Sequence, residues 1–432
     1  MKIPVYEIAS VLEDVKTRMI SEDQEKLDWC ISQLLSNLSE PVIPPQLLLK
    51  SPSLTKEAVS QIEQHSNLLL IRQAKNDEEA SKQLINNRMV KYTPLNIKQE
   101  INLPICNIDI NDFYLDIFEL AQEFGGVMIM CMYAQKIFAY WDLFLKMGID
   151  LQDFLRYSKY IGEGYKPNIY HNVLHGAFVM QACHIFLLSS NLVELAEMTP
   201  LHTTSLLLSA MVHDYKHPGL NNTYLYLTNE KLAIRYNDIS ILENYHVAKA
   251  FQVAQKENLN IFSNISKEEY RTLRKLMINA ILGTDMTKHS KYVTDAQMKL
   301  TKNTNFIEEK EFLISLLMHL GDLSNSCRNE KLSDEWSFRV CEEFFIQGDK
   351  ERSNDMIVNP LMDRYKVNIA KSQVGFIGAV LIPFLNPICK SIKGMEFLLE
   401  NAQSNKEGWG RRVEEFEDKM VNKGNIYERG FS

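Results

Sequence analysis

The sequence predicts an all-α protein built around one large helical domain. Apolar residues recur at three- and four-residue spacing along most of the chain, which is the period of an amphipathic helix. No run alternates strictly enough over several segments to build a sheet, and 17 Gly and 13 Pro in 432 residues are too few for a turn-dense all-β fold. A hydrophobic fraction of 45% with 24% charged residues excludes a wholly disordered chain.

The first 95 residues form a separate segment in this interpretation. Helical spacing runs over residues 4–40, the prolines of 41–45 interrupt it, and a polar helical stretch follows over 55–89. Residues 1–95 are too few for a ligand-binding sensor domain of ordinary size. We expect a helical regulatory or docking segment that packs on the body, pairs with a second copy in a homodimer, or binds a partner protein of a larger assembly.

The main domain is predicted at residues 96–400, and helical periodicity dominates it. A tail at 401–432 is charged and punctuated by glycines, so we expect it to be loosely held. The helices that we expect in the main domain lie at 111–124, 127–146, 151–161, 172–189, 202–213, 229–235, 240–256, 267–282, 308–328, 333–347 and 368–390.

Charge and cysteine content limit the partners and the compartment. The 47 basic and 55 acidic residues give a net charge of −8, which argues against a general nucleic-acid binder because such a protein needs a basic face. The start Met1-Lys2-Ile3-Pro4 runs straight into a mixed polar and apolar helix pattern, so we expect no secretory leader. Charged and polar residues interrupt the apolar stretch 125–147, so we expect no membrane span there. The seven cysteines are scattered without CxxC spacing and predict reduced thiols in a soluble cytoplasmic protein.

Histidine and aspartate mark the chemistry of the chain. His171 and His175 stand four residues apart, which would place both imidazoles on one helix face. His213 and Asp214 follow one apolar helix, and Asp322 stands near the end of another. An unpaired buried carboxylate costs several kcal/mol, so these groups must pair with one another or bind metal.

A single metal centre accounts for these residues most economically. His175, His213, Asp214 and Asp322 together offer two imidazoles and two carboxylates, which suit Zn²⁺. An aspartate can bridge to a second, more hydrated ion such as Mg²⁺ or Mn²⁺. Two ions roughly 3.5–4 Å apart would activate a shared water as hydroxide for attack on phosphorus, and His171 would protonate the leaving oxygen. Each fragment alone is more often an ordinary core residue; the hypothesis depends on their conjunction.

Further motifs follow these residues in a fixed order. They are Tyr170-His171-Asn172-x-x-His175, His213-Asp214-x-x-His217-Pro218-Gly219, Tyr236-Asn237-Asp238, Leu242-Glu243-Asn244-x-His246, Thr284-Asp285-Met286-x-Lys288-His289, Asp322-Leu323-Ser324-Asn325, Glu343-Phe344-Phe345-x-Gln347-Gly348-Asp349 and Ser372-Gln373-Val374-Gly375-Phe376-Ile377. In order and spacing, residues 105–395 resemble the class I 3′,5′-cyclic nucleotide phosphodiesterases.

The resemblance implies a fold, a reaction and cofactors. The fold is the compact, all-α catalytic domain of the HD type. The reaction is metal-dependent hydrolysis of cAMP or cGMP to nucleoside 5′-monophosphates by a metal-bridged hydroxide, with Zn²⁺ and Mg²⁺ (or Mn²⁺) as the two ions. Three sets of roles carry over to matching positions: metal ligands His175, His213, Asp214 and Asp322; general acid His171; residues that support the centre from behind, His217, Glu243 and Asp285.

The same resemblance implies a nucleotide site. Gln373 matches a glutamine that hydrogen-bonds the purine edge, and its amide could serve adenine or guanine by flipping. Phe376 and Val340 match the two apolar faces that enclose the purine, which a planar base in a wet cleft requires. Tyr170 and Asn325 complete the expected contacts, and Asn325 favours cAMP.

Two positions depart from the family pattern. Phe178 and Gly378 stand where aspartate is common, and Phe178 cannot accept a hydrogen bond. Phe178 is the best support for an alternative, a catalytically weak scaffold of the same fold that docks through its N-terminal helices. Retention of every residue of the predicted metal site argues against that alternative. A nucleotidase for phosphate monoesters is a second alternative, and it gives no reason for Gln373 and Phe376.

Overall fold

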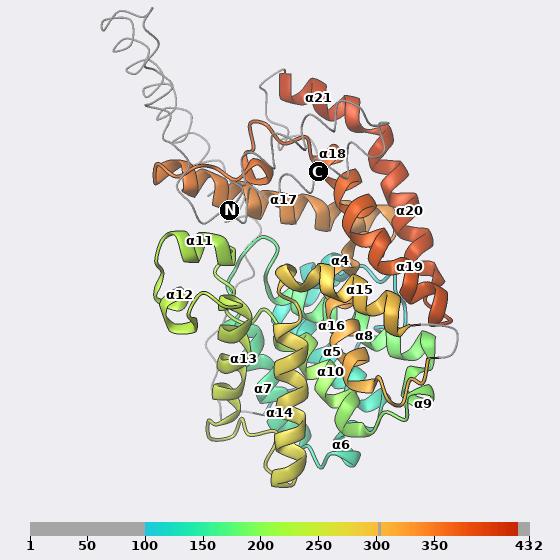
Figure 1. Cartoon of the computed structure of the whole chain (residues 1–432). Coiled ribbons are helices and arrows are strands. Elements are labelled where there is room, and N and C mark those ends of the chain that lie inside the picture. The colour runs from blue at the N-terminus through green and yellow to red at the C-terminus, as the bar shows by residue number, and fades with distance from the viewer. Residues whose placement is uncertain (1–99, 301–303, 422–432) are drawn as a thin grey trace, which may run out of the picture.

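The structure is a computed structural model that describes residues 100–300 and 304–421. The predicted N-terminal segment of residues 1–95 lies outside the described residues, so its role stays a prediction. The described chain is built from helices without a strand, which confirms the all-α fold class (Figure 1).

The first half of the described chain forms the lower body of the molecule in Figure 1. Its helices are α4 (Ile117–Phe124), α5 (Gly126–Tyr140), α6 (Leu143–Lys146), α7 (Leu151–Gly164), α8 (Val173–Ser190), α9 (Leu192–Leu195), α10 (Pro200–Val212), α11 (Asn222–Leu227), α12 (Lys231–Tyr236), α13 (Ile241–Ala254), α14 (Lys267–Leu282), the 3₁₀ turn η2 (Met286–Lys288) and α15 (His289–Lys299).

The second half returns through the body and then covers its upper side (Figure 1). Its elements are α16 (Lys310–Leu323), η3 (Ser324–Cys327), α17 (Glu330–Ser353), η4 (Pro360–Met362), α18 (Ile369–Phe376), the π-helical turn η5 (Ile377–Leu381), α19 (Ile382–Ser391), α20 (Glu396–Arg411) and α21 (Val413–Val421).

Helix α8 runs through the core of the lower body. It packs against α5, α10 and α16, and nearly all of its 18 side chains are buried. By length and composition alone, α8 and the stretch 369–391 are apolar enough to cross a membrane, and so is the pair α4 and α5, which is bent by 114°. In α8, 89% of the apolar window is buried inside the protein, so its composition matches the core that surrounds it.

Two expectations about local structure were wrong. His171 does not share a helix face with His175, because α8 begins at Val173 and Asn172 is its extended N-cap, whose side chain accepts a hydrogen bond from the backbone N–H of Leu174. The chain after residue 400 is not loosely held at its start, because α20 crosses that boundary and buries Trp409 completely.

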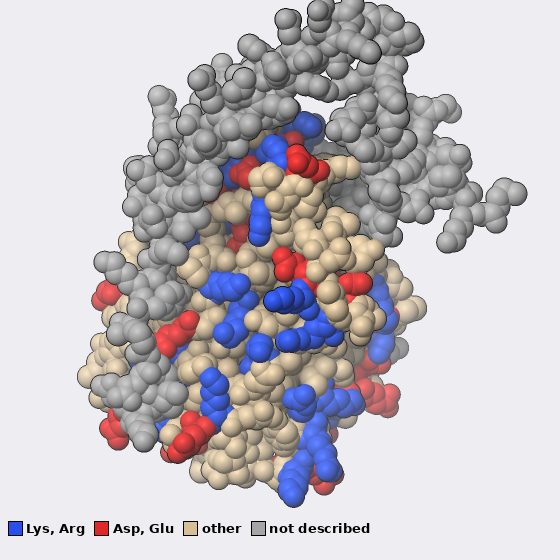
Figure 2. All heavy atoms as spheres, turned by 90° about the vertical axis from the view of Figure 1, so that its left-hand side faces the viewer, with Lys and Arg blue, Asp and Glu red and all other residues tan. Residues whose placement is uncertain are grey.

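Charged side chains are unevenly distributed over the surface. Figure 2 shows Lys and Arg gathered in the middle of the face that lies on the left of Figure 1, although the net charge of the chain is −8. Lys166, Lys216 and Lys350 lie close enough together that burial and the other two lysines lower the pKa of Lys166. Lys216 stands between Asp214 and His217 in the sequence, so positive charge borders the predicted site.

Candidate metal centre and active site

Three helices place the four predicted metal ligands. His175 lies in the first turn of α8, His213 is the C-cap of α10 and is followed by Asp214, and Asp322 lies in the last turn of α16. Helices α8 and α16 approach closely beside Asp322. A Cβ added to Gly321 would stand only 2.9 Å from the Cys183 sulfur. Glycine at position 321 thus permits the contact that brings Asp322 to His175.

The four side chains converge on one point. The Nε2 of His175 lies 3.0 Å from Asp322 Oδ1 and 3.4 Å from Asp214 Oδ2. The Nε2 of His213 lies 3.1 Å from Asp214 Oδ2, 3.3 Å from Asp322 Oδ1 and 3.2 Å from His175 Nε2. Both imidazoles are fully buried. The sequence-predicted ligand set is therefore assembled in the structure.

These atoms fit a divalent cation. His213 Nδ1 donates to the Ala210 carbonyl at 2.9 Å, so in the neutral imidazole the Nε2 lone pair faces His175 Nε2 and two carboxylate oxygens. Such a set of electron pairs repels itself unless a proton or a cation lies between its members. Tetrahedral zinc with ligands at ~2.0–2.1 Å separates neighbouring ligand atoms by about 3.3 Å, which is close to the distances found here.

Electrostatics in the centre favour ionised carboxylates. Burial alone would raise the pKa of Asp214, but His213 and His171 hold it well below its usual range. Burial acts in the same direction on Asp322, and His213 and His175 again lower its pKa. Ionised aspartates are the form that binds metal.

Glu343 fixes the position of His171. Its Oε1 lies 2.5 Å from His171 Nδ1, and its Oε2 accepts hydrogen bonds from the backbone N–H groups of Tyr170 and His171. The opposite ring nitrogen, Nε2, lies 4.0 Å from Asp214 Oδ2 and so faces the metal centre. Burial opposes the charged form of the imidazole, but Glu343 and Asp214 raise the pKa of His171 to about 9.

His217 and His246 pack behind the centre. The ring of His217 stacks on His171 with centroids 4.0 Å apart, and its Nδ1 accepts from the Gly219 N–H. His246 bonds to the Tyr215 carbonyl through Nδ1, and its buried Nε2 points to Asp214 Oδ1 at 3.7 Å without a hydrogen bond. His217 thus lies against His171, its predicted role stays a prediction, and His246 joins the group.

Glu243 and Asp285 lie further back. Both carboxylate oxygens of Glu243 accept from the Asn222 amide, and burial together with Asp285 raises the pKa of Glu243 to about 7. Asp285 accepts from the hydroxyl groups of Ser240 and Thr287. No described contact joins either carboxylate directly to the four ligands, so their predicted roles stay predictions.

Helix α17 connects the metal centre to the predicted purine site. Its Trp336 packs on His175 with ring centroids 6.0 Å apart, and the neighbouring Ser337 donates to Gln373 Oε1 at 3.1 Å. Gln373 Nε2 points to the Cys341 sulfur at 3.7 Å. Gln373 therefore lies one helix away from the metal ligands with its amide held in one orientation.

The other predicted nucleotide contacts differ in exposure. Val340 and Phe376 are partly buried and pack against the core, and their predicted contact with a purine stays a prediction. Asn325 is buried in η3, three residues after Asp322. Tyr170 is also buried, with its ring 4.7 Å from that of His175, so it packs against a metal ligand.

Sequence reasoning left Glu343 and His246 without a role, although both belong to the quoted motifs. Both are buried in the structure, and their place in those motifs was the sequence signal that could have found them. Their partners lie far away in the sequence, at Tyr170 and His171 for Glu343 and at Tyr215 for His246.

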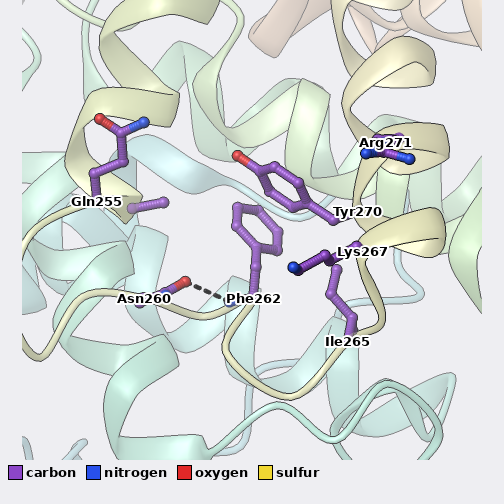
Figure 3. A pocket seen from close by; sticks show the side chains of 8 residues that line it. Gln255, Asn260, Phe262, Ile265, Lys267, Tyr270 and Arg271 are labelled. Atoms are coloured by element: carbon purple, nitrogen blue, oxygen red, sulfur yellow. Dashed lines mark hydrogen bonds between the residues drawn. The ribbon is translucent and has the colours of Figure 1, made fainter.

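A surface cavity of about 570 Å³ lies away from these residues, between the end of α13 and the start of α14 (Figure 3). Phe262 and Tyr270 form its floor, and Lys267 and Arg271 stand at its side. It contains none of the predicted site residues.

Comparisons with known proteins agree with this geometry. The sequence model of the 3′5′-cyclic nucleotide phosphodiesterase family matches residues 170–402, more than half of the chain. The 3′,5′-cyclic-AMP phosphodiesterase 4C of Mus musculus is 29% identical over 447 residues, covering 94% of this chain and 65% of the relative. The protein of that name from Rattus norvegicus is 34% identical over 317 residues, covering 71% of this chain and 58% of the relative. The chain thus spans less than two thirds of either relative.

Solved structures show the same fold. Two crystal structures of the phosphodiesterase domain of the Salpingoeca rosetta rhodopsin phosphodiesterase superpose with TM-scores of 0.66 and 0.65 at 24% identity. They cover 72% and 73% of this chain, and 98% and 95% of the solved chains. With the converging His and Asp ligands and the family match over residues 170–402, the chain belongs to the 3′5′-cyclic nucleotide phosphodiesterase family.

Proposed function

We propose that this protein hydrolyses 3′,5′-cyclic nucleotides, cAMP in preference to cGMP, to nucleoside 5′-monophosphates. The observation that carries the proposal is the convergence of His175, His213, Asp214 and Asp322 beside a histidine held by Glu343. Both relatives are cyclic-AMP phosphodiesterases, which supports the preference for cAMP.

The four converging side chains would hold Zn²⁺, and the second oxygen of Asp214 would reach toward Mg²⁺ or Mn²⁺. Bound divalent ions would supply an activated water nucleophile and neutralise charge on the phosphoryl oxygens. His246 donates through Nδ1 to the Tyr215 carbonyl, so its Nε2 lone pair, which faces Asp214 Oδ1, would accept a hydrogen bond from a water bound at this second site.

His171 would deliver the proton that the reaction needs. Glu343 holds Nδ1, so Nε2 is the atom left to face the substrate. A histidine that donates a proton to the departing O3′ contributes typically 10²–10⁴-fold to the rate. The stacked His217 ring keeps the imidazole from rotating away.

Base recognition would fall to Gln373, with Val340 and Phe376 on the two faces of the purine. Because Ser337 donates to Gln373 Oε1, the amide nitrogen is the atom that can turn to the base as a donor. Adenine presents ring nitrogens as acceptors, which fits an amide donor. The positive charge of Lys166, Lys216 and Lys350 would draw the anionic substrate toward the site.

A steady-state assay of the purified chain with cAMP, cGMP and 5′-AMP in Mg²⁺ tests this function. We expect turnover of cAMP, slower turnover of cGMP and none of 5′-AMP. Asp322→Ala removes one ligand and should abolish turnover, with at least a 10³-fold loss expected when a metal centre is broken. Asp295→Ala on the surface of α15 removes an equal charge without touching the site and should leave the rate unchanged.

Release of phosphate from 5′-AMP with no cyclic nucleotide turnover would replace this function with that of a monoester nucleotidase. Equal cAMP turnover by the wild type and Asp322→Ala would refute the metal site.

A cytoplasmic location and docking through residues 1–95 belong to the same proposal. The six cysteines of the described residues are all free, as expected in a reducing compartment.

A further inference from the structure

Arg328 is a fully buried cation without a carboxylate partner in the described part of the chain. Only 1% of it is exposed, and burial lowers the pKa of its guanidinium to about 9. One nitrogen donates to Gln181 Oε1 at 3.3 Å, and Nε has no hydrogen-bond partner. A buried arginine normally has a carboxylate beside it, so another interaction must stabilise this one.

Two aromatic rings provide that interaction. The guanidinium carbon of Arg328 lies 3.8 Å from the ring centroid of Phe113 and 4.4 Å from that of Phe178. A desolvated cation over an aromatic face is stabilised by the ring quadrupole, most strongly when water is excluded as it is here. Phe178 therefore stabilises the buried charge of Arg328, as a carboxylate would do at that position.

The contact between Arg328 and Phe178 joins two segments that carry metal ligands. Phe178 lies three residues after His175 on α8, and Arg328 lies six residues after Asp322, directly after η3. The distance of 3.0 Å between His175 Nε2 and Asp322 Oδ1 thus depends on how these two segments are held together.

His175 itself is oriented by rings. Its Nδ1 is buried and has no hydrogen-bond partner, whereas a metal-bound imidazole usually donates this N–H to an acceptor. The rings of Tyr170, Phe178 and Trp336 surround it, with that of Phe178 nearly parallel at 18°. Packing takes the place of a hydrogen bond in fixing the ring.

From these contacts we infer that Arg328 and Phe178 are positioning residues of the metal centre. The cation held between Phe113 and Phe178 fixes the Phe178 ring against His175 and clamps α8 to the segment after Asp322. The inference rests on the proposed metal site and adds to it the device that sets its ligand spacing.

Zinc affinity of the full chain tests the inference without any use of turnover. Metal-free protein is titrated with Zn²⁺ in competition with a chromophoric chelator. We expect Phe178→Leu and Arg328→Met each to weaken Zn²⁺ binding about tenfold, the lower end of what loss of a residue behind a metal ligand costs. Both variants place an apolar side chain of comparable size at a buried position, so the fold should persist.

Phe138→Leu is the matched control. Phe138 is as buried as Phe178 and stacks on Phe154 with centroids 4.2 Å apart, away from the four ligands. It should lower the melting temperature as Phe178→Leu does and leave the Zn²⁺ affinity unchanged.

A carboxylate provides the rescue. Phe178→Asp places an acid beside Arg328 and should bind Zn²⁺ at least as tightly as the wild type, whereas Phe178→Asp combined with Arg328→Met should not. Zn²⁺ affinities within twofold of the wild type for Phe178→Leu and Arg328→Met, or an equal loss in Phe138→Leu, would overturn the inference. A wild-type chain that binds no Zn²⁺ would instead overturn the proposed metal site.

Discussion

Glu343 makes three contacts to one short stretch of backbone and side chain. It holds Nδ1 of His171 and the N–H groups of Tyr170 and His171. Burial alone would raise the pKa of Glu343, but His171 holds it below its usual value. A carboxylate in this position favours the protonated imidazole and fixes its direction. Glu343 is thus the residue on which the proposed proton delivery by His171 depends.

Glu343→Gln removes the charge and keeps the shape. We expect kcat for cAMP to fall about 10–100-fold, the range typical of a lost supporting partner, with zinc content unchanged because no ligand is altered. Kinetics together with metal analysis of the same preparation measures both quantities. Loss of zinc in this variant would mean that Glu343 supports the ligands and not the acid.

At the scale of residues, the sequence predicted which His and Asp side chains converge, but it missed several of the residues that surround them. His175, His213, Asp214 and Asp322 were identifiable because each is a polar group in an apolar context. Glu343 belongs to a helix with many other charges, and its role depends on His171, 172 residues away. Phe178 was rightly expected to offer no hydrogen bond, but Arg328 as its partner required the folded structure.

Among the helices, too, some were predicted from the sequence and others were missed. Helices with strong apolar periodicity, such as α8 and α14, were predicted within a few residues of their bounds. Helix α20 was missed because its sequence is charged and contains two glycines. Tertiary contacts stabilise it: Leu398, Ala402 and Trp409 are fully buried against the rest of the domain. Long-range packing of this kind overrides local propensity.

The packing of α8 against the end of α5 makes the fold sensitive to acid. His184 of α8 accepts from the Trp141 indole through Nδ1 and contacts Asn111 through Nε2, both at 2.9 Å. Burial lowers its pKa to about 4, whereas the unfolded chain titrates near 6.5. The unfolded state therefore binds the proton first, so stability is complete above pH 6.5 and falls as the pH drops toward 4.

His184→Gln keeps an acceptor for Trp141 and removes the titration. Titration of His184 should lower the unfolding free energy of the wild type by about 2 kcal/mol between pH 7 and pH 5. The variant lacks this titration, so its unfolding free energy should fall by about 2 kcal/mol less over the same range. Urea unfolding at the two pH values measures the difference. Parallel pH profiles for both proteins would contradict the assignment of a buried neutral histidine.

On the scale of the whole molecule, the C-terminal helix α20 supports the segment that follows Asp322. Asn401 donates to the Cys327 carbonyl at 2.9 Å, and Asn405 donates to those of Ser326 and Arg328 at 2.9 and 2.8 Å. These carbonyls belong to the segment that begins at Asp322. Helix α20 thus holds the backbone that follows Asp322, one of the four proposed metal ligands.

Removal of α20 should therefore affect more than the C-terminus. A chain that ends at Met395 exposes the surface that Trp409 covers and leaves three carbonyls without partners; we expect a loss of more than about 4 kcal/mol of stability, or no folded protein. A chain that ends at Val421 keeps α20 and α21 and serves as the control. Thermal unfolding followed by circular dichroism compares the two, and equal melting temperatures would contradict this role.

The central position of α8 also has a consequence for biosynthesis. The ribosome makes α8 after α5 and shortly before α10. Helix α16, which also covers α8, is made only after more than 100 further residues. During that interval the nascent chain exposes the apolar surface of α8, which could associate with other apolar surfaces. We expect chaperones to attend the unfinished polypeptide at this stage, and slow translation between residues 190 and 310 to lower the yield of native protein.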